Sequence, residues 1–180
     1  MKKIGTSLSG AFLLEPRVFS DSRGFFLESF NQRGMSDLGI REPFVQDNHS
    51  YSVHNVIRGL HFQSEHPQGK LVRAIVGEIL DVLVDLRKSS PTFGKWEALT
   101  LSAENQRMLW IPPGFAHGFR VVSADAHVLY KATDFYFPQH ERTLLWNDRD
   151  LSIDWKNEGK PIISPKDQAG LPFREVPTFP

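Results

Sequence analysis

The chain contains no cysteine, so neither a structural disulfide nor a thiolate metal site can form. It also lacks an apolar run of about 18 residues, the length that a transmembrane helix needs. Two lysines stand near the start, but the residues after them are too polar for the apolar core of a signal peptide. These absences predict a cytoplasmic protein that does not bind a membrane.

The chain also has no net charge at pH 7, because 21 Lys and Arg residues balance 21 Asp and Glu residues. No broad field of one sign attracts nucleic acid, although a locally basic pocket for a small anion is compatible with this balance. The sequence has no repeat, no low-complexity tract and no linker with a shift in composition. A chain of this length predicts one domain, or one domain with an extension, and we take residues 1–180 as a single domain.

What the sequence does contain is a series of short β-rich runs separated by Gly and Pro turns. One short helix is expected over 31–39, with Asn31 as its cap, and no strong period follows Pro138. The pattern predicts an all-β sandwich or barrel. The expected strands are 11–19 (broken at Pro16), 25–30, 44–53, 57–63, 70–76, 79–86, 96–101, 108–111, 116–122 and 126–133.

The stretch from Val56 to Leu86 carries the strongest structural and functional signals in the sequence. Two of its β-rich runs are joined by Gly77-Glu78, a connection typical of a two-residue hairpin. In the second run, alternate apolar residues from Leu80 to Leu86 predict one face in the core.

Polar residues interrupt the first run of this stretch at Arg58 and His61, with Lys70 following. Strict alternation sends Arg58 and His61 to opposite faces of a strand, and a bulge at Gly59 would bring them together. A lone histidine is more often structural than functional. Its basic neighbours, and a glycine that permits close approach, favour a site.

Three further stretches carry groups that could react. The turn Pro112-Pro113-Gly114 delivers His117 to the start of a strand, which alone is a moderate signal. Tyr130 and Tyr136 follow, although tyrosines commonly pack with a satisfied hydroxyl. Residues 164–167 end in Asp167 and are equally compatible with a solvated loop.

The spacing Pro-x-Gly-x-x-His at 112–117 resembles the second motif of the cupin superfamily, a jelly roll or double-stranded β-helix. Metal-binding cupins carry a second His in the first motif, where this chain has Gln63, and an Asn where it has Val121. Two histidines do not satisfy zinc or iron, which need three or four ligands. The resemblance therefore implies a cupin with no metal, suited to acid–base chemistry.

A more specific resemblance covers residues 12–171 in order. Its motifs are Arg-Gly-Leu-His-Phe-Gln at 58–63, Gln-Gly-Lys-Leu-Val-Arg at 68–73, the run 81–87, Ser-Pro-Thr-Phe-Gly-Lys-Trp at 90–96 and the run 109–119. These look like the dTDP-4-dehydrorhamnose 3,5-epimerase family. The resemblance implies an all-β cupin jelly roll with short peripheral helices and no cofactor. It also implies a homodimer in which the N-terminal strands meet the partner, and a C-terminal tail that packs on the barrel.

The implied substrate is dTDP-4-dehydro-6-deoxy-D-glucose, inverted at C3 and C5 to dTDP-4-dehydro-L-rhamnose, in the pathway that leads to L-rhamnose and lipopolysaccharide. Matched motif by motif, His61 is the base, Asp167 its carboxylate partner, Tyr130 the acid and Lys70 the cation beside the enolate. The substrate-binding positions are Arg23, Glu28, Gln46, Asp47, Asn48, Arg58, His117, Tyr136, Glu141 and Lys166. Tyr136 is the residue expected to stack on the thymine.

These residue types suit the implied reaction. A proton on a carbon beside a ketone is only weakly acidic. A base must therefore remove it while another group stabilises the enolate that forms. An Asp partner fixes the tautomer of a His and favours its protonated form.

Other functions stay open. They are a 3- or 5-monoepimerase on a related nucleotide 4-keto sugar, and a sugar-nucleotide-binding cupin without activity. A metal-dependent oxygenase is disfavoured by the missing ligands.

Overall fold

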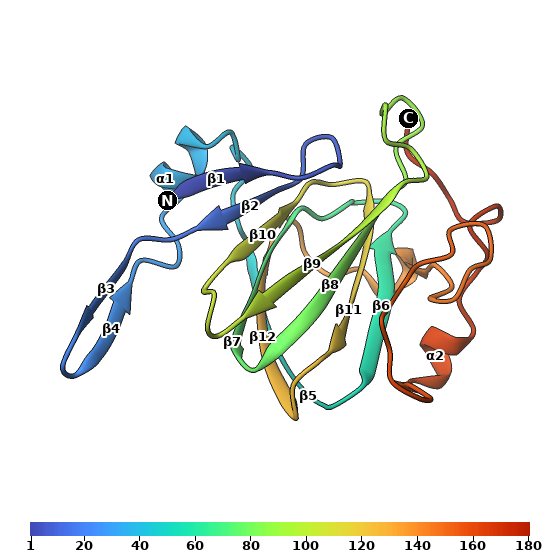
Figure 1. Cartoon of the computed structure of the whole chain (residues 1–180). Coiled ribbons are helices and arrows are strands. Elements are labelled where there is room, and N and C mark those ends of the chain that lie inside the picture. The colour runs from blue at the N-terminus through green and yellow to red at the C-terminus, as the bar shows by residue number, and fades with distance from the viewer.

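The computed structural model describes all 180 residues and contains two facing sheets (Figure 1). In the first sheet the strand order is β1 (Lys2–Gly5), β2 (Phe12–Glu15), β10 (Met108–Ile111), β7 (Lys70–Val76), β12 (Asp125–Ala132), β5 (Gln46–Val53). In the second it is β13 (Glu141–Thr143), β6 (Val56–Gln63), β11 (Phe115–Val121), β8 (Glu78–Asp85), β9 (Trp96–Ser102). A short strand, β14 (Ile162–Ile163), lies parallel to β6. The all-β prediction is confirmed.

The predicted core face of β8, from Leu80 to Leu86, is buried, and so is its other face. Ile79 and Leu83 pack between the two sheets, while Leu80 and Val82 pack on the outer side of the second sheet. The outer cluster also includes Leu144, Leu151, Trp155 and Val176 of the C-terminal segment. Because that segment covers the second sheet, the central strand has no solvent face, and alternation alone could not reveal this.

The predicted hairpin at Gly77-Glu78 is wrong. Strands β7 and β8 belong to different sheets, and the chain turns a corner between them at Gly77, where φ is +72°. A Cβ at this position would lie 2.0 Å from the carbonyl oxygen of Asp125. A Gly-X pair between β-rich runs marks a tight turn, but it does not say whether the two runs pair with each other.

The predicted bulge at Gly59 is confirmed. Across the ladder from β6 to β11, His61 lies opposite His117 and Arg58 lies opposite Phe119. Two residues of β6 therefore face the single residue Gly118, and the extra residue restores Arg58 and His61 to one face. A Cβ on Gly59 would come within 2.6 Å of the Gly118 Cα, which requires glycine at this place.

Near the N-terminus, the predicted break at Pro16 separates β2 from a hairpin formed by β3 (Val18–Asp21) and β4 (Gly24–Leu27). The hairpin projects away from the two sheets (Figure 1). Its aromatic side chains are solvent-exposed, with Phe25 at 59% and Phe26 at 70%.

Helices are short and peripheral. The helix α1 (Gln32–Asp37) begins at the predicted cap, Asn31, whose side chain accepts two backbone N–H groups. The helix α2 (Pro165–Gln168) and the 3₁₀ turn η1 (Pro138–His140) lie in the C-terminal part. None of the helices has the length and apolar character needed to cross a membrane.

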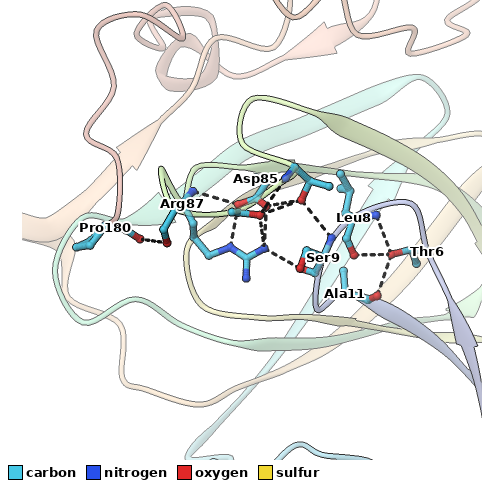
Figure 2. Close-up of polar contacts among 10 residues, drawn as sticks. Thr6, Leu8, Ser9, Ala11, Asp85, Arg87 and Pro180 are labelled. Atoms are coloured by element: carbon cyan, nitrogen blue, oxygen red, sulfur yellow. Dashed lines mark hydrogen bonds and ion pairs between the residues drawn. The ribbon is translucent and has the colours of Figure 1, made fainter.

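A buried carboxylate ties the end of β8 to the N-terminal loop (Figure 2). Asp85 accepts hydrogen bonds of 2.5–3.0 Å from Arg87, Ser90 and Thr92. Arg87 also donates to the carbonyl oxygen of Ser9, and the N–H of Ser9 donates to the Thr92 hydroxyl. Burial alone would raise the pKa of Asp85, but these donors hold it below its usual value.

Candidate active site

A pocket of about 240 Å³ opens between the two sheets. Both sheets contribute side chains, and so does the segment that follows β12. The lining residues are Ser50, Arg58, His61, Phe62, Gln63, Gln68, Lys70, His117, Gly118, Phe119, Tyr130, Tyr136 and Glu141.

His61 forms a close pair with Asp167, whose side chain is only 5% exposed. The Nε2 atom of His61 lies 2.6 Å from Oδ1 of Asp167. The other carboxylate oxygen accepts the N–H of Gly59, and Ser164, the cap of α2, accepts the N–H of Asp167. Since a carboxylate only accepts, Nε2 carries the proton and Nδ1 is left as the basic nitrogen.

Burial would raise the pKa of Asp167, but the hydrogen bond and charge of His61, with the N–H of Gly59, outweigh burial and lower it. The carboxylate is therefore ionised at neutral pH. It can hold the imidazole ring and stabilise the imidazolium that forms when Nδ1 takes a proton.

Lys70 begins β7 in the opposite sheet and is 9% exposed. Its Nζ atom lies 3.4 Å from the carbonyl oxygen of His61. Burial lowers the pKa of Lys70 to about 8, although the negative charges of Asp81 and Glu141 act in the other direction. The pocket thus holds a desolvated ammonium that is charged at neutral pH.

A second buried His–carboxylate pair lies beside Lys70. The Nε2 atom of His117 is 2.9 Å from Oδ1 of Asp81, and Asp81 is completely buried. Burial lowers the pKa of His117, as do the charges of Lys70 and His61, although Asp81 opposes this. Sequence reasoning missed Asp81, yet a carboxylate within the apolar run 79–84 was the signal that could have found it.

Tyr130 lines the pocket from β12, so it comes from the sheet opposite His61. Burial raises the pKa of its phenol, the charge of Glu141 adds to this, and Arg58 opposes it. The phenol is therefore protonated at neutral pH and able to act as an acid.

Three of the predicted binding residues form a connected group. Glu141 accepts a hydrogen bond of 2.7 Å from the Tyr136 hydroxyl and lies 2.5 Å from Nζ of Lys166. Burial would raise the pKa of Glu141, but these two partners outweigh it and lower the pKa. The hydrogen bond to Glu141 in turn raises the pKa of Tyr136.

Arg58 is held by hydrogen bonds to the Ser52 hydroxyl and the carbonyl of Tyr51. On β5 nearby, Nδ2 of Asn48 and the hydroxyl of Ser50 are buried without a partner. Ser50 lines the pocket, whereas Asn48 lines a neighbouring pocket that shares Tyr130 with it.

Other predicted residues lie elsewhere in this chain. Arg23 is at the tip of the β3–β4 hairpin, 88% exposed and 2.6 Å from Asp21. Glu28 accepts a hydrogen bond from Asn31. Asp47 is exposed and pairs with Lys131 at 2.8 Å.

Gln46 does not line the pocket, but its side chain donates a hydrogen bond to Asn48 and accepts one from the backbone N–H of Tyr136, which does line it.

No group of three or more His, Asp or Glu side chains in the structure is arranged to hold a metal ion. Gln63 uses its amide in hydrogen bonds to nearby backbone, and Val121 is buried in the core. Metal-free action stays a prediction.

Comparison with known proteins gives a consistent result. A family model described as dTDP-4-dehydrorhamnose 3,5-epimerase matches residues 5–175. A dTDP-4-dehydrorhamnose 3,5-epimerase from Pseudomonas aeruginosa is 54% identical over 100% of both chains.

Two solved structures are similar along nearly the whole chain. A dTDP-6-deoxy-D-glucose-3,5-epimerase from Legionella pneumophila, in complex with dTDP-4-keto-L-rhamnose, has a TM-score of 0.95 and 46% identity, over 97% of this chain and 94% of that one. A 3′-monoepimerase from Streptomyces bikiniensis, in complex with dTDP-quinovose, has a TM-score of 0.87 and 31% identity, over 95% and 87%.

Proposed function

Since the chain belongs to the dTDP-4-dehydrorhamnose 3,5-epimerase family, we propose that it inverts C3 and C5 of dTDP-4-dehydro-6-deoxy-D-glucose to give dTDP-4-dehydro-L-rhamnose. The fold is the cupin jelly roll of its structural relatives, and the chain is an isomerase of dTDP-rhamnose biosynthesis. The observation that carries the residue roles is a single pocket with a His–carboxylate pair on one sheet and a buried phenol on the other.

The first step is removal of a proton from the carbon beside the C4 ketone. Nδ1 of His61 takes this proton, and Asp167 stabilises the resulting imidazolium. The electron pair of the C–H bond moves into the enolate, whose oxygen becomes negative. Lys70 stabilises that oxygen, because an ammonium in a desolvated pocket interacts with developing charge more strongly than it would in water.

Inversion requires the returning proton to reach the opposite face of the same carbon. Tyr130 donates it, since its phenol is protonated and comes from the sheet facing His61. His61 then releases its proton and Tyr130 regains one, both through solvent. With the groups reset, the cycle is repeated at the other carbon.

The rest of the pocket binds the nucleotide. Arg58 offers a fixed guanidinium to the diphosphate. Asn48 adds an unpaired buried donor from the neighbouring pocket that shares Tyr130. The ring of Tyr136, 47% exposed and tethered through its hydroxyl to Glu141, provides a face for the thymine.

We also propose a cytoplasmic homodimer in which Arg23 and Glu28 complete the pocket of the partner. Two features of the chain support this: the exposed Phe25 and Phe26 on a projecting hairpin, and β5, which has no strand on its outer side.

The experiment is proton NMR after incubation with dTDP-4-keto-6-deoxyglucose in deuterated water. The proposal expects deuterium at C3 and C5 and the L-rhamno configuration. Exchange and inversion at one carbon would instead identify a monoepimerase, a function carried by one structural relative. Binding without exchange would identify a non-enzymatic sugar-nucleotide protein. Turnover is expected to survive dialysis against a chelator.

A further inference from the structure

The segment 134–137 follows β12 and carries Tyr136 beside the pocket without any regular secondary structure. Phe135 and Tyr136 are 57% and 47% exposed, so burial of their rings does not fix this stretch. Something else must hold its backbone.

Gln63, at the end of β6, holds two of its backbone groups. The Nε2 atom donates to the carbonyl of Phe135 at 3.2 Å, and Oε1 accepts the N–H of Phe137 at 2.7 Å. Nε2 also donates to the carbonyl of His66 at 2.7 Å. Gln63 is 3% exposed, so these bonds are shielded from competing water.

Two more glutamines hold the neighbouring groups. Nε2 of Gln68 donates to the carbonyl of Asp134 at 2.8 Å. Oε1 of Gln46 accepts the N–H of Tyr136 at 3.0 Å. Each of the four residues 134–137 therefore has one backbone group bonded to a glutamine side chain. Gln63 and Gln68 belong to the end of β6 and the connection that follows it, and Gln46 belongs to β5.

We propose that Gln63 and Gln68 are positioning residues that fix segment 134–137, and thereby set the affinity of the pocket for the aromatic base of a nucleoside diphosphate. They act through Tyr136 and do not touch the reacting carbons. This inference rests on the proposed function, in that Tyr136 is taken as the ring that meets the base.

The first test is Gln63→Met, which keeps an unbranched side chain of similar volume and removes all three hydrogen bonds. Binding of dTDP alone, measured by calorimetry, is expected to weaken about tenfold, and KM for the 4-keto sugar to rise by about the same factor, with kcat within about threefold of wild type. Gln68→Met is expected to act in the same direction with a smaller effect, because it removes one bond.

The matched control is Gln139→Met. Gln139 follows the same segment, is exposed, and its side chain makes no hydrogen bond in the structure. Its affinity for dTDP is expected to equal that of wild type.

A double-mutant cycle separates positioning from general damage to the pocket. If Gln63 acts through Tyr136, adding Gln63→Met to Tyr136→Ala weakens dTDP binding no further. A full additional loss in the Tyr136→Ala background, or a fall in kcat as large as the rise in KM, would overturn the inference.

Amide hydrogen exchange gives a readout that does not depend on activity. Gln63→Met is expected to accelerate exchange at Phe137 about tenfold while the amides of β8 stay protected, which also shows that the variant is folded. The inference would be overturned if exchange at Phe137 were unchanged in Gln63→Met. It would also be overturned if the folded variant bound dTDP with wild-type affinity. If the wild-type protein itself neither bound dTDP nor turned over the sugar, the proposed function would fail, and the exchange result alone would decide whether the glutamines hold the segment.

Discussion

At the scale of single residues, the chemistry of the pocket depends on what each reactive group is paired with. Asp167 holds Nε2 of His61 in its protonated form, whereas burial and Glu141 keep the phenol of Tyr130 protonated. One group is prepared to accept a proton and the other to give one. The two must therefore respond differently to substitution.

We expect His61→Ala to lose both inversion and deuterium exchange, by the roughly 10²–10⁴-fold usual for a general base. Tyr130→Phe keeps the base and Lys70, so the enolate still forms and His61 can return a deuteron to the face from which the proton came. This variant is expected to retain exchange with configuration preserved and to lose most inversion. Proton NMR in deuterated water measures both quantities. Wild-type inversion by Tyr130→Phe, or exchange catalysed by His61→Ala, would mean that the roles are misassigned.

Lys70 predicts the alkaline side of the pH profile. Its pKa is lowered to about 8, so the ammonium loses its proton as pH rises through this value. The enolate then lacks its cation, and kcat/KM is expected to fall about tenfold per pH unit above pH ~8. Lys70→Met should be slower by roughly 10²–10³-fold and lack this alkaline limb. A limb that persists in Lys70→Met would assign it to another group.

The sequence was enough to find site residues whose type is unusual among their neighbours in the chain. It was not enough where the role of a residue depends on a partner far away in the sequence. His61, Lys70 and Tyr130 were predicted, and the structure brings all three to one pocket. Asp81 was overlooked because its partner, His117, lies on another strand. The links between Gln63 and segment 134–137 span more than 70 positions and leave no local signal.

At the scale of elements, strands were predictable and their pairing was not. Alternation and turn residues located most of the strands to within a few positions, but they missed β1, β13 and β14. They could not show that the chain changes sheets at Gly77, nor that β8 is covered on both faces, because both facts depend on segments far away in the sequence. The bulge at Gly59 was predictable, since two polar residues of one site had to share a face.

The Asp85 network yields a prediction about stability. Asp85→Asn keeps the shape but removes the charge that Arg87 meets at 2.7 Å, so the free energy of unfolding at pH 7 should fall by about 3–5 kcal/mol. The folded-state pKa of Asp85 is lowered, so its contribution is present above the unfolded-state pKa and lost as pH falls through the folded-state value. The gap between wild type and Asp85→Asn should begin to close below about pH 4. Denaturant titrations at pH 7, 4 and 3 measure it, and a gap that is constant with pH would assign the loss to packing.

At the scale of the whole molecule, the pocket between the two sheets contains half of the predicted site residues, and the β3–β4 hairpin stands apart from it. In a monomer, the rings of Phe25 and Phe26 remain in water, and Arg23 at the hairpin tip is not among the residues that line the pocket of its own chain. Both features are accounted for if the hairpin contacts a second copy. Burial of large aromatic side chains is a principal source of association energy.

The dimer can be tested by separating assembly from chemistry. Phe25→Ser with Phe26→Ser is expected to give a monomer at micromolar concentration, measured by analytical ultracentrifugation, with loss of most activity because each pocket lacks Arg23 of its partner. Arg23→Ala should stay dimeric and raise KM.

Mixing two impaired variants gives a sharper test of which chain Arg23 serves. Arg23→Ala and His61→Ala homodimers are each impaired, yet exchange of subunits between them creates one pocket that has an intact His61 and receives Arg23 from the other chain. Activity of the mixture should therefore rise above the sum of the two variants, toward one quarter of wild type at random exchange (roughly half of the dimers mixed, with one good pocket in each). If subunits exchange but the mixture is no more active than the two variants measured separately, Arg23 acts on the pocket of its own chain. If the monomer is fully active, the partner contributes nothing to the pocket.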